Sequence, residues 1–411
     1  MNFNFLKKLI FDIKELALSQ VLILVLLFIQ IGVVTRGLGA MNYGRVALIM
    51  TLIALVFRTL HARNSDVTLL MLNKNNQNIY TVSLFFDLAI GLLSSLICVI
   101  VFKSNINQYF GNYNLNLLLY FLLFTRIFQT FSESSKAILT FHGKFKRFAL
   151  VESTSTIARF LTIILLFYFN KTIESYLIGQ AVYSIFYGFF SLYISREYFK
   201  YSELSANSVK DYFYEFKLDF LKQRVDQLVG IIPQHLDLVI LGYFTDFSTV
   251  GIFRIAKRFV EPLNSLITIL NPYIQNKLSN NSFKISSIKD LLINVLLPIS
   301  SILTVLYIFF GKFLLVFISG EEFVSAYTPM LILLLGYLIY LMTFWTRQIL
   351  LFNNLIHYHS VSRVLSLLTF LILSIIFVNL YKANGIALAL SISMIFQKIF
   401  EYYIIKKQVN L

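Results

Sequence analysis

The stretch VLSLLTFLILSIIFVNL, residues 364–380, contains no charged residue and does not alternate between polar and apolar positions. A helix crosses the ~30 Å hydrocarbon core of a membrane with about 20 apolar residues. A strand of a membrane β-barrel would instead be a segment of about ten residues with alternating polarity. The stretch therefore predicts a transmembrane α-helix.

Apolar runs of similar length recur along the whole chain. Hydrophobic residues make up 58% of the 411 residues and charged residues 13%, whereas soluble domains have about 45–50% and about 25%. A soluble protein is therefore excluded. We predict an all-α integral membrane protein with about twelve transmembrane helices, at 16–35, 44–62, 80–103, 115–141, 148–169, 173–195, 217–244, 250–277, 288–311, 327–352, 360–381 and 384–405.

Positive charges indicate how these helices are oriented. The net charge of +15 would suggest nucleic acid as the partner of a soluble protein. Here Lys and Arg fall mostly in every second loop, which the positive-inside rule explains as a topology signal, so we expect no nucleic-acid partner. Both termini are predicted to be cytoplasmic, and the N-terminal residues to form a short amphipathic helix.

A duplication is indicated by the longest polar break, residues 196–214. It separates two groups of six spans, and we place the domains at 1–200, which includes the amphipathic N-terminal segment, and 201–411. Tyr43-Gly44 and Val250-Gly251 occupy the same place in the two halves. Because each half has an even number of spans, the two bundles insert in the same orientation and are related by a pseudo-two-fold axis along the membrane normal.

Two arginines lie near mid-membrane, Arg126 in the fourth span and Arg159 in the fifth. An ionisable group at the bilayer centre costs at least ~2.5–3.5 kcal/mol, and both interfaces are ~15 Å away, too far for either side chain to reach water easily. We expect Arg126 and Arg159 to face an internal polar cavity.

The eighth span carries Arg254, Lys257, Arg258 and Glu261, whose spacings of three and four place them on one helical face. In one interpretation Arg254 reaches the outer interface while Lys257 and Glu261 form an ion pair. In the other, this face lines a cavity and meets an anionic ligand. Arg258 suits that role best, because a guanidinium binds phosphate oxygens through two hydrogen bonds.

Further charged residues lead to more open interpretations. Arg58 is a candidate ligand for the same anion, although it lies near the cytoplasmic end of its span, where reaching the interface explains it equally well. Asp237 and Glu261 are the candidates for ion coupling, and Asp237 could equally pair with a cation. His357 and His359 point to different faces of a helix, so no metal site is predicted. Nor are a catalytic residue or a cofactor expected.

Four stretches resemble one transporter family. RGLGAMNYG at 36–44 is similar to a signature that follows the first span of polysaccharide exporters, the O-antigen flippases of the multidrug/oligosaccharidyl-lipid/polysaccharide (MOP) superfamily. The other three stretches are DLVILG followed by VGIF (237–242 and 250–253), SGEEFVSA (319–326) and GIALA (385–389). The resemblance covers nearly the whole chain.

This resemblance implies a function. The family is expected to have a V-shaped pair of six-helix bundles around a cationic cavity, and to carry an undecaprenyl-pyrophosphate-linked oligosaccharide from the inner to the outer leaflet of the bacterial inner membrane. Its cavity cations correspond to Arg36, Lys257 and Arg258. One branch of the superfamily has Ala-Asp-Arg where this chain has Ala256-Lys257-Arg258. Whether this protein uses a carboxylate in that part of the span is therefore left open. The implied partners are the lipid-linked oligosaccharide, membrane lipids, a polysaccharide polymerase and a chain-length regulator.

Two other functions remain open. A cation-coupled drug exporter of the same superfamily would favour carboxylates in its cavity, and the arginines at 126, 159 and 258 argue against it. A membrane-embedded polysaccharide polymerase or glycosyltransferase generally needs a long external loop or an acidic motif. The predicted outer loops are roughly a dozen residues or fewer, too short for a catalytic subdomain.

Overall fold

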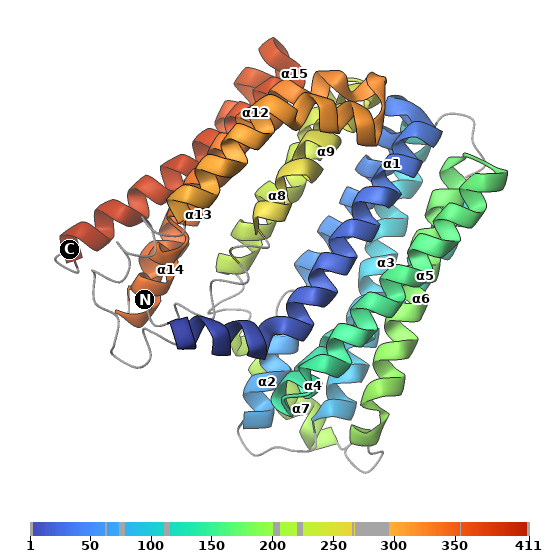
Figure 1. The fold of residues 1–411 in the computed structure, drawn as a ribbon. Helices are drawn as coiled ribbons and strands as arrows, with labels where there is room; N and C mark the ends of the chain where they lie inside the picture. Colours follow the sequence, from blue (N-terminus) through green and yellow to red (C-terminus); the bar gives the residue numbers. More distant parts are fainter. Residues whose placement is uncertain are drawn as a thin grey trace. The chain divides into compact units, whose positions relative to one another are not determined.

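A computed structural model describes the chain over residues 3–61, 64–73, 79–110, 116–199, 206–219, 225–264, 267, 296–353 and 355–408. Figure 1 shows that the regular structure in these ranges is helical. Seven of the described helices are long and apolar enough to cross a membrane. Two of these, α1 and α15, each contain two of the predicted spans within one continuous helix with an internal kink.

The first part of the chain follows the predicted spans and adds two helices to them. The added helices are α2 and α7, which replace parts of the chain that were expected to be polar loops. The elements are α1 (Phe3–His61), α2 (Asn64–Asn73), α3 (Tyr80–Phe110), α4 (Asn116–Phe141), α5 (Phe145–Phe169), α6 (Ile173–Ser195), the 3-10 helix η1 (Arg196–Tyr198) and α7 (Ala206–Asp219).

The second part is described less completely. Most of the predicted span 250–277 beyond residue 264, and the start of the span at 288–311, lie outside the described residues. The predicted span 327–352 is broken near Thr343 into two helices. The elements are α8 (Val225–Phe244), α9 (Phe247–Val260), α12 (Leu297–Ser319), η5 (Glu321–Ala326), α13 (Tyr327–Met342), α14 (Trp345–Phe352) and α15 (Ile356–Gln408).

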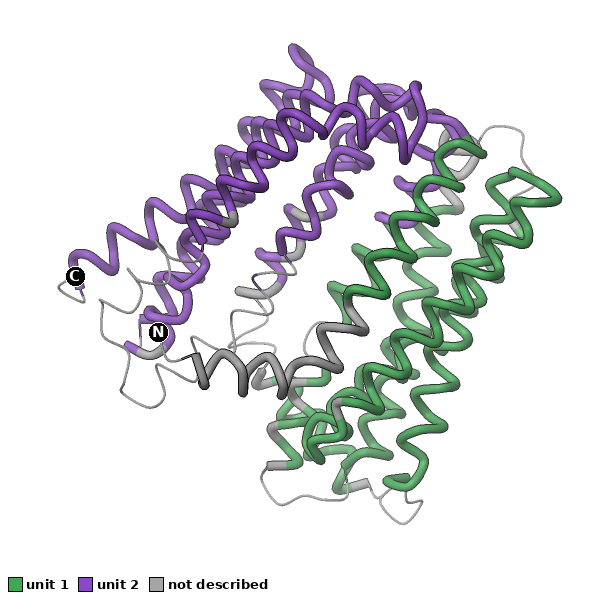
Figure 2. The backbone as a smooth tube through the Cα atoms, viewed as in Figure 1, with its two compact units in different colours: residues 1–38, 52–227 green, residues 39–51, 228–411 purple. Residues whose placement is uncertain are grey.

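The chain divides into two compact units, coloured in Figure 2. Unit 1 contains residues 1–38 and 52–227, and unit 2 contains residues 39–51 and 228–411. Two segments therefore group differently from the halves drawn at residue 200. Helix α7 packs on α2 and α3 in unit 1, where Tyr212 is fully buried and donates a hydrogen bond to Asn64 Oδ1 (2.8 Å). Residues 39–51 pack with unit 2.

Glycines explain why residues 39–51 pack so closely within unit 2. A Cβ on Gly44 would lie 1.7 Å from the carbonyl oxygen of Phe247, and a Cβ on Gly251 would lie 2.3 Å from the carbonyl oxygen of Ala40. The two backbones can approach this closely only without side chains. Gly39 has a φ of 71°, which allows the kink in α1. The two glycines that suggested a duplication thus lie against each other.

A carboxylate stabilises the kink. Glu322 in η5 accepts a hydrogen bond from the backbone N–H of Ala40 (2.8 Å), the first residue after Gly39. Beside it, the rings of Tyr43 and Phe323 meet edge to face with centroids 6.0 Å apart. Three of the four family-like stretches therefore meet at one packing centre inside unit 2.

Candidate functional site

In unit 1, the guanidinium of Arg126 lies among uncharged polar groups. Arg126 extends from α4, and its Nη1 donates a hydrogen bond of 2.6 Å to the side-chain carbonyl of Gln129. Ser184 on α6 donates to the same oxygen (3.3 Å). The buried Nε–H of Arg126 finds no acceptor in the described part of the chain. One donor of this cation is therefore left for a ligand or for water.

Two other arginines lie near Arg126. Arg159 on α5 lies with its Cζ 4.8 Å from the centroid of the Tyr183 ring, a cation–π contact. Arg159 and Arg58, on α1, are both close enough to repel Arg126 electrostatically. The structure thus brings together three of the predicted ligand-binding arginines in unit 1, where their repulsion would be relieved by an anion.

Arg36 takes a different place in α1. Its side chain is exposed and lies three residues before the kink at Gly39. The predicted role of Arg36 in binding the cargo stays a prediction.

In unit 2, the predicted charged face of α9 divides into two groups. Lys257 donates a hydrogen bond to Asp237 on α8, and both side chains are buried, with 6% and 0% of their surface exposed. Of the two roles left open for Asp237, the structure shows pairing with a cation. The predicted contact of Lys257 with the cargo stays a prediction.

The remaining three charges of α9 form a second group. Arg258 Nη1 donates to Glu261 Oε2 (2.9 Å), and Arg254 Nη1 lies 3.4 Å from Glu261 Oε1. Their side chains are 18% (Arg254), 29% (Glu261) and 30% (Arg258) exposed. In one interpretation of the sequence Lys257 pairs with Glu261; in the structure both guanidinium groups contact Glu261, while Lys257 donates to Asp237. Charges exposed to hydrocarbon would be costly, so this face must meet a polar environment.

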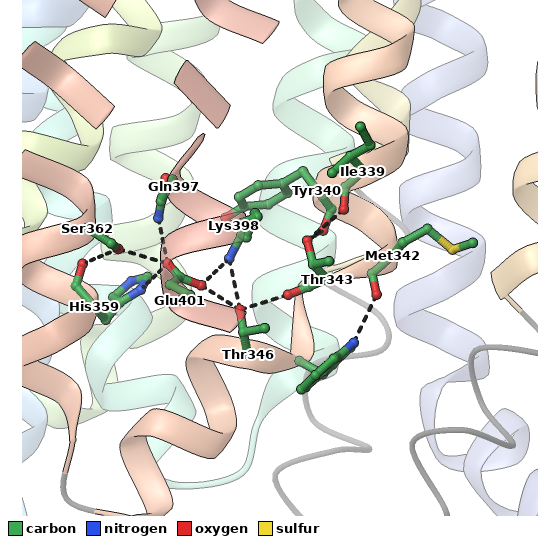
Figure 3. A network of polar contacts seen from close by, with 11 residues as sticks. Ile339, Tyr340, Met342, Thr343, Thr346, His359, Ser362, Gln397, Lys398 and Glu401 are labelled. Atoms are coloured by element: carbon green, nitrogen blue, oxygen red, sulfur yellow. Dashed lines mark hydrogen bonds and ion pairs between the residues drawn. The ribbon is translucent and has the colours of Figure 1, made fainter. Parts of the chain in front are cut away.

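A buried polar network in unit 2 was not identified from the sequence (Figure 3). The Glu401 carboxylate on α15 accepts hydrogen bonds from five side chains, at 2.5 to 3.0 Å. These are Thr346, His359, Ser362, Gln397 and Lys398. The signal was available, because Lys398 and Glu401 are charges three residues apart inside an apolar span. With its oxygens saturated, Glu401 holds α14 and both ends of α15 together.

A comparable network lies in unit 1. Asp87 on α3 is fully buried and accepts hydrogen bonds from Asn64 on α2 and from the backbone N–H of Ser134 on α4 (3.0 Å). These contacts join three helices. Within the described residues, no group of three or more His, Cys, Asp or Glu side chains is arranged to hold a metal ion.

This fold is shared with solved membrane transporters. The inward closed structure of the lipid II flippase MurJ matches with a TM-score of 0.74 and 18% identity, over 97% of this chain and 87% of that chain. An inward-facing multidrug resistance transporter of the MATE family matches with a TM-score of 0.69 and 14% identity, over 94% of both chains. A MOP superfamily transporter from Pyrococcus furiosus matches with a TM-score of 0.67 and 13% identity, over 97% of this chain and 95% of that one.

These similarities define the class of protein. The chain is a multi-pass integral membrane protein with the MOP transporter fold, which confirms the predicted fold class. It belongs to the polysaccharide biosynthesis protein family, whose model matches residues 33–328, as the resemblance predicted. Comparison with curated protein sequences gives no match.

Proposed function

We propose that this protein is a flippase that moves an undecaprenyl-pyrophosphate-linked oligosaccharide from the inner to the outer leaflet by alternating access. The observation that carries the proposal is the buried Nε–H of Arg126, left without an acceptor within the described residues and surrounded by neutral dipoles and by further arginines. A pyrophosphate offers several oxygens in the geometry that a guanidinium binds.

The comparisons support the same class of cargo. The chain belongs to a family of polysaccharide biosynthesis proteins, and export of a polysaccharide requires that its saccharides cross the membrane. The similar MurJ is a flippase for a lipid-linked substrate. The proposed cargo would place its pyrophosphate at the arginines and its polyprenyl tail in lipid. We place the protein in the bacterial inner membrane with both termini in the cytoplasm. A polymerase and a chain-length regulator would act on the product at the outer leaflet.

The charges disfavour a drug exporter. A drug exporter for apolar cations would have to accept its substrate beside Arg126, Arg159 and Arg58. Each of these arginines would repel a bound cation. If the protein were an enzyme, loss of Arg126 would change polymer synthesis from a substrate that is already outside. The leaflet in which the lipid-linked intermediate accumulates therefore distinguishes the transporter hypothesis from the enzyme hypothesis.

The test replaces Arg126 and follows the lipid-linked intermediate in each leaflet. Arg126→Ala should reduce transport by about tenfold or more, because a hydrogen bond to a charged group is worth ~1.5–3 kcal/mol. Arg126→Lys should retain part of the activity, since Lys keeps the charge without the planar fork. The control is Arg147→Ala, which removes an exposed arginine whose Nη1 lies 2.5 Å from Glu197. All variants are compared at equal amounts in the membrane.

Two results would contradict the proposal. One is normal flipping by Arg126→Ala and by an Arg58, Arg126 and Arg159 triple Ala variant. The other is an intermediate that accumulates in the outer leaflet.

A further inference from the structure

The two oxygens of Glu261 are shared between two guanidinium groups. Oε2 accepts from Arg258 (2.9 Å) and Oε1 lies 3.4 Å from Arg254. These are the same two groups that a phosphate at this face of α9 would use. Glu261 therefore occupies, within the protein itself, a position that an anionic ligand would need.

Arg126 in unit 1 has a different environment. Its hydrogen bond goes to the neutral amide of Gln129, and no carboxylate lies within ion-pair distance of it among the described residues. An anion can approach Arg126 without displacing a charged group. An anion that approaches Arg258 must first compete with the carboxylate of Glu261.

The geometry permits that competition. Glu261 carries one negative charge against the two positive charges of Arg254 and Arg258, so the group keeps a net attraction for anions. All three side chains are partly exposed, which gives a ligand access and lets the released carboxylate turn to water. The buried Lys257–Asp237 pair joins α8 to α9 separately, so release of Glu261 need not separate these helices.

We propose that Glu261 is an internal counter-anion of Arg254 and Arg258 that the pyrophosphate of the cargo displaces. This inference rests on the proposed function and assigns Glu261 a role in specificity. A pyrophosphate carries more charge and more oxygens than a carboxylate, so it can replace Glu261 at both arginines. A ligand with one carboxylate would exchange like for like and gain little.

Binding of inorganic pyrophosphate to the full-length protein in nanodiscs tests the displacement by isothermal titration calorimetry. Glu261→Gln should bind pyrophosphate about fivefold more tightly than wild type, the gain expected from removing a partly exposed ion pair of ~1 kcal/mol. Glu321→Gln is the control, since it removes an exposed carboxylate of η5 elsewhere in unit 2. Its affinity should equal that of wild type.

A double variant separates displacement from general repulsion. If Glu261 acts by occupying the guanidinium groups, the gain from Glu261→Gln should fall below about twofold in an Arg258→Gln background. A gain of the same size there would show through-space repulsion and overturn the proposal. So would unchanged or weaker binding by Glu261→Gln, which would mean that Glu261 positions the arginines.

Two further measurements complete the test. If Glu261→Gln does not fold, Glu261→Asp decides, because it keeps the charge but withdraws the carboxylate by one methylene. Tighter binding supports displacement, and equal or weaker binding overturns it. If Arg126→Ala or Arg258→Ala weakens pyrophosphate binding while the Glu261 variants behave as wild type, the proposed function survives and only the displacement fails. If neither Arg126→Ala nor Arg258→Ala affects binding, the proposed function itself fails.

Discussion

The buried pair of Lys257 and Asp237 gives a sharp test of whether Asp237 couples transport to an ion or only holds two helices together. Lys257→Met keeps the length of the side chain and removes its charge. Asp237 is then left fully buried opposite an apolar group. Breaking a buried ion pair in this way costs about 3–5 kcal/mol. With exposed fractions of 6% and 0%, solvent cannot screen the pair, and the full cost should apply.

Removing both charges should largely reverse the loss. A double variant, Asp237→Leu with Lys257→Met, replaces the pair by apolar side chains and leaves no uncompensated charge, which is often neutral or stabilising. We expect a lower midpoint of thermal unfolding in detergent for Lys257→Met and a midpoint near that of wild type for the double variant. If the pair only joins α8 to α9, the double variant should also flip its cargo at a near-normal rate.

Two outcomes would refute this reasoning. If Lys257→Met unfolds at the same temperature as wild type, Asp237 is not left as a buried, uncompensated charge, and the stabilising role of the pair is refuted. If the double variant is stable but inactive, Asp237 has a part in transport itself. Ion coupling would then be the better interpretation of this carboxylate.

Two other predictions concern the start of α9. The backbone N–H of Thr249 donates to the side chain of Asp246 (2.8 Å) and lowers the pKa of this N-cap carboxylate. Asp246→Ala should therefore cost about 1 kcal/mol at neutral pH. This contribution is present above the ordinary pKa of Asp and is lost as the pH falls through the lowered one, so melting of the two proteins should converge in acid. Gly44→Ala places a Cβ 1.7 Å from the Phe247 carbonyl and should lower the unfolding temperature in detergent, whereas Gly143→Ala, at a turn with open space but a φ of 67°, should lower it less.

Hydropathy was sufficient to predict the described membrane helices but not the helices α2 and α7. The long spans are apolar throughout, and crossing a membrane requires each to be helical whatever its neighbours are. Helix α7 has no such requirement, because half of its residues are polar and it packs through a tertiary contact, the buried Tyr212 against α2. The spacing of apolar residues within α7 does not show which distant part of the chain they contact.

The sequence predicted that the charges on α9 share a face. It did not predict which side chain each of them contacts. Successive residues on a helix turn by about 100°, so Arg254, Arg258 and Glu261 fall within a narrow arc and Lys257 lies at its edge. That edge faces Asp237 on α8. Spacing along one helix predicts which side chains share a face. Only the packing of α8 against α9 determines that Lys257 is the residue that pairs with the buried Asp237.

The family-like stretches and the arginines carry different information. Gly44, Gly251 and Glu322 belong to three of these stretches, and the structure places them at one packing centre, where a larger side chain or a lost carboxylate would disturb the kink of α1. The glycines are required for steric reasons and Glu322 for its hydrogen bond, and both requirements would hold for any cargo. Arg126 and Arg258 lie outside that centre, and nothing in the packing of the glycines requires a guanidinium at either position. The signature therefore reports how the fold is built, while the nature of the cargo has to be inferred from the cations in the spans.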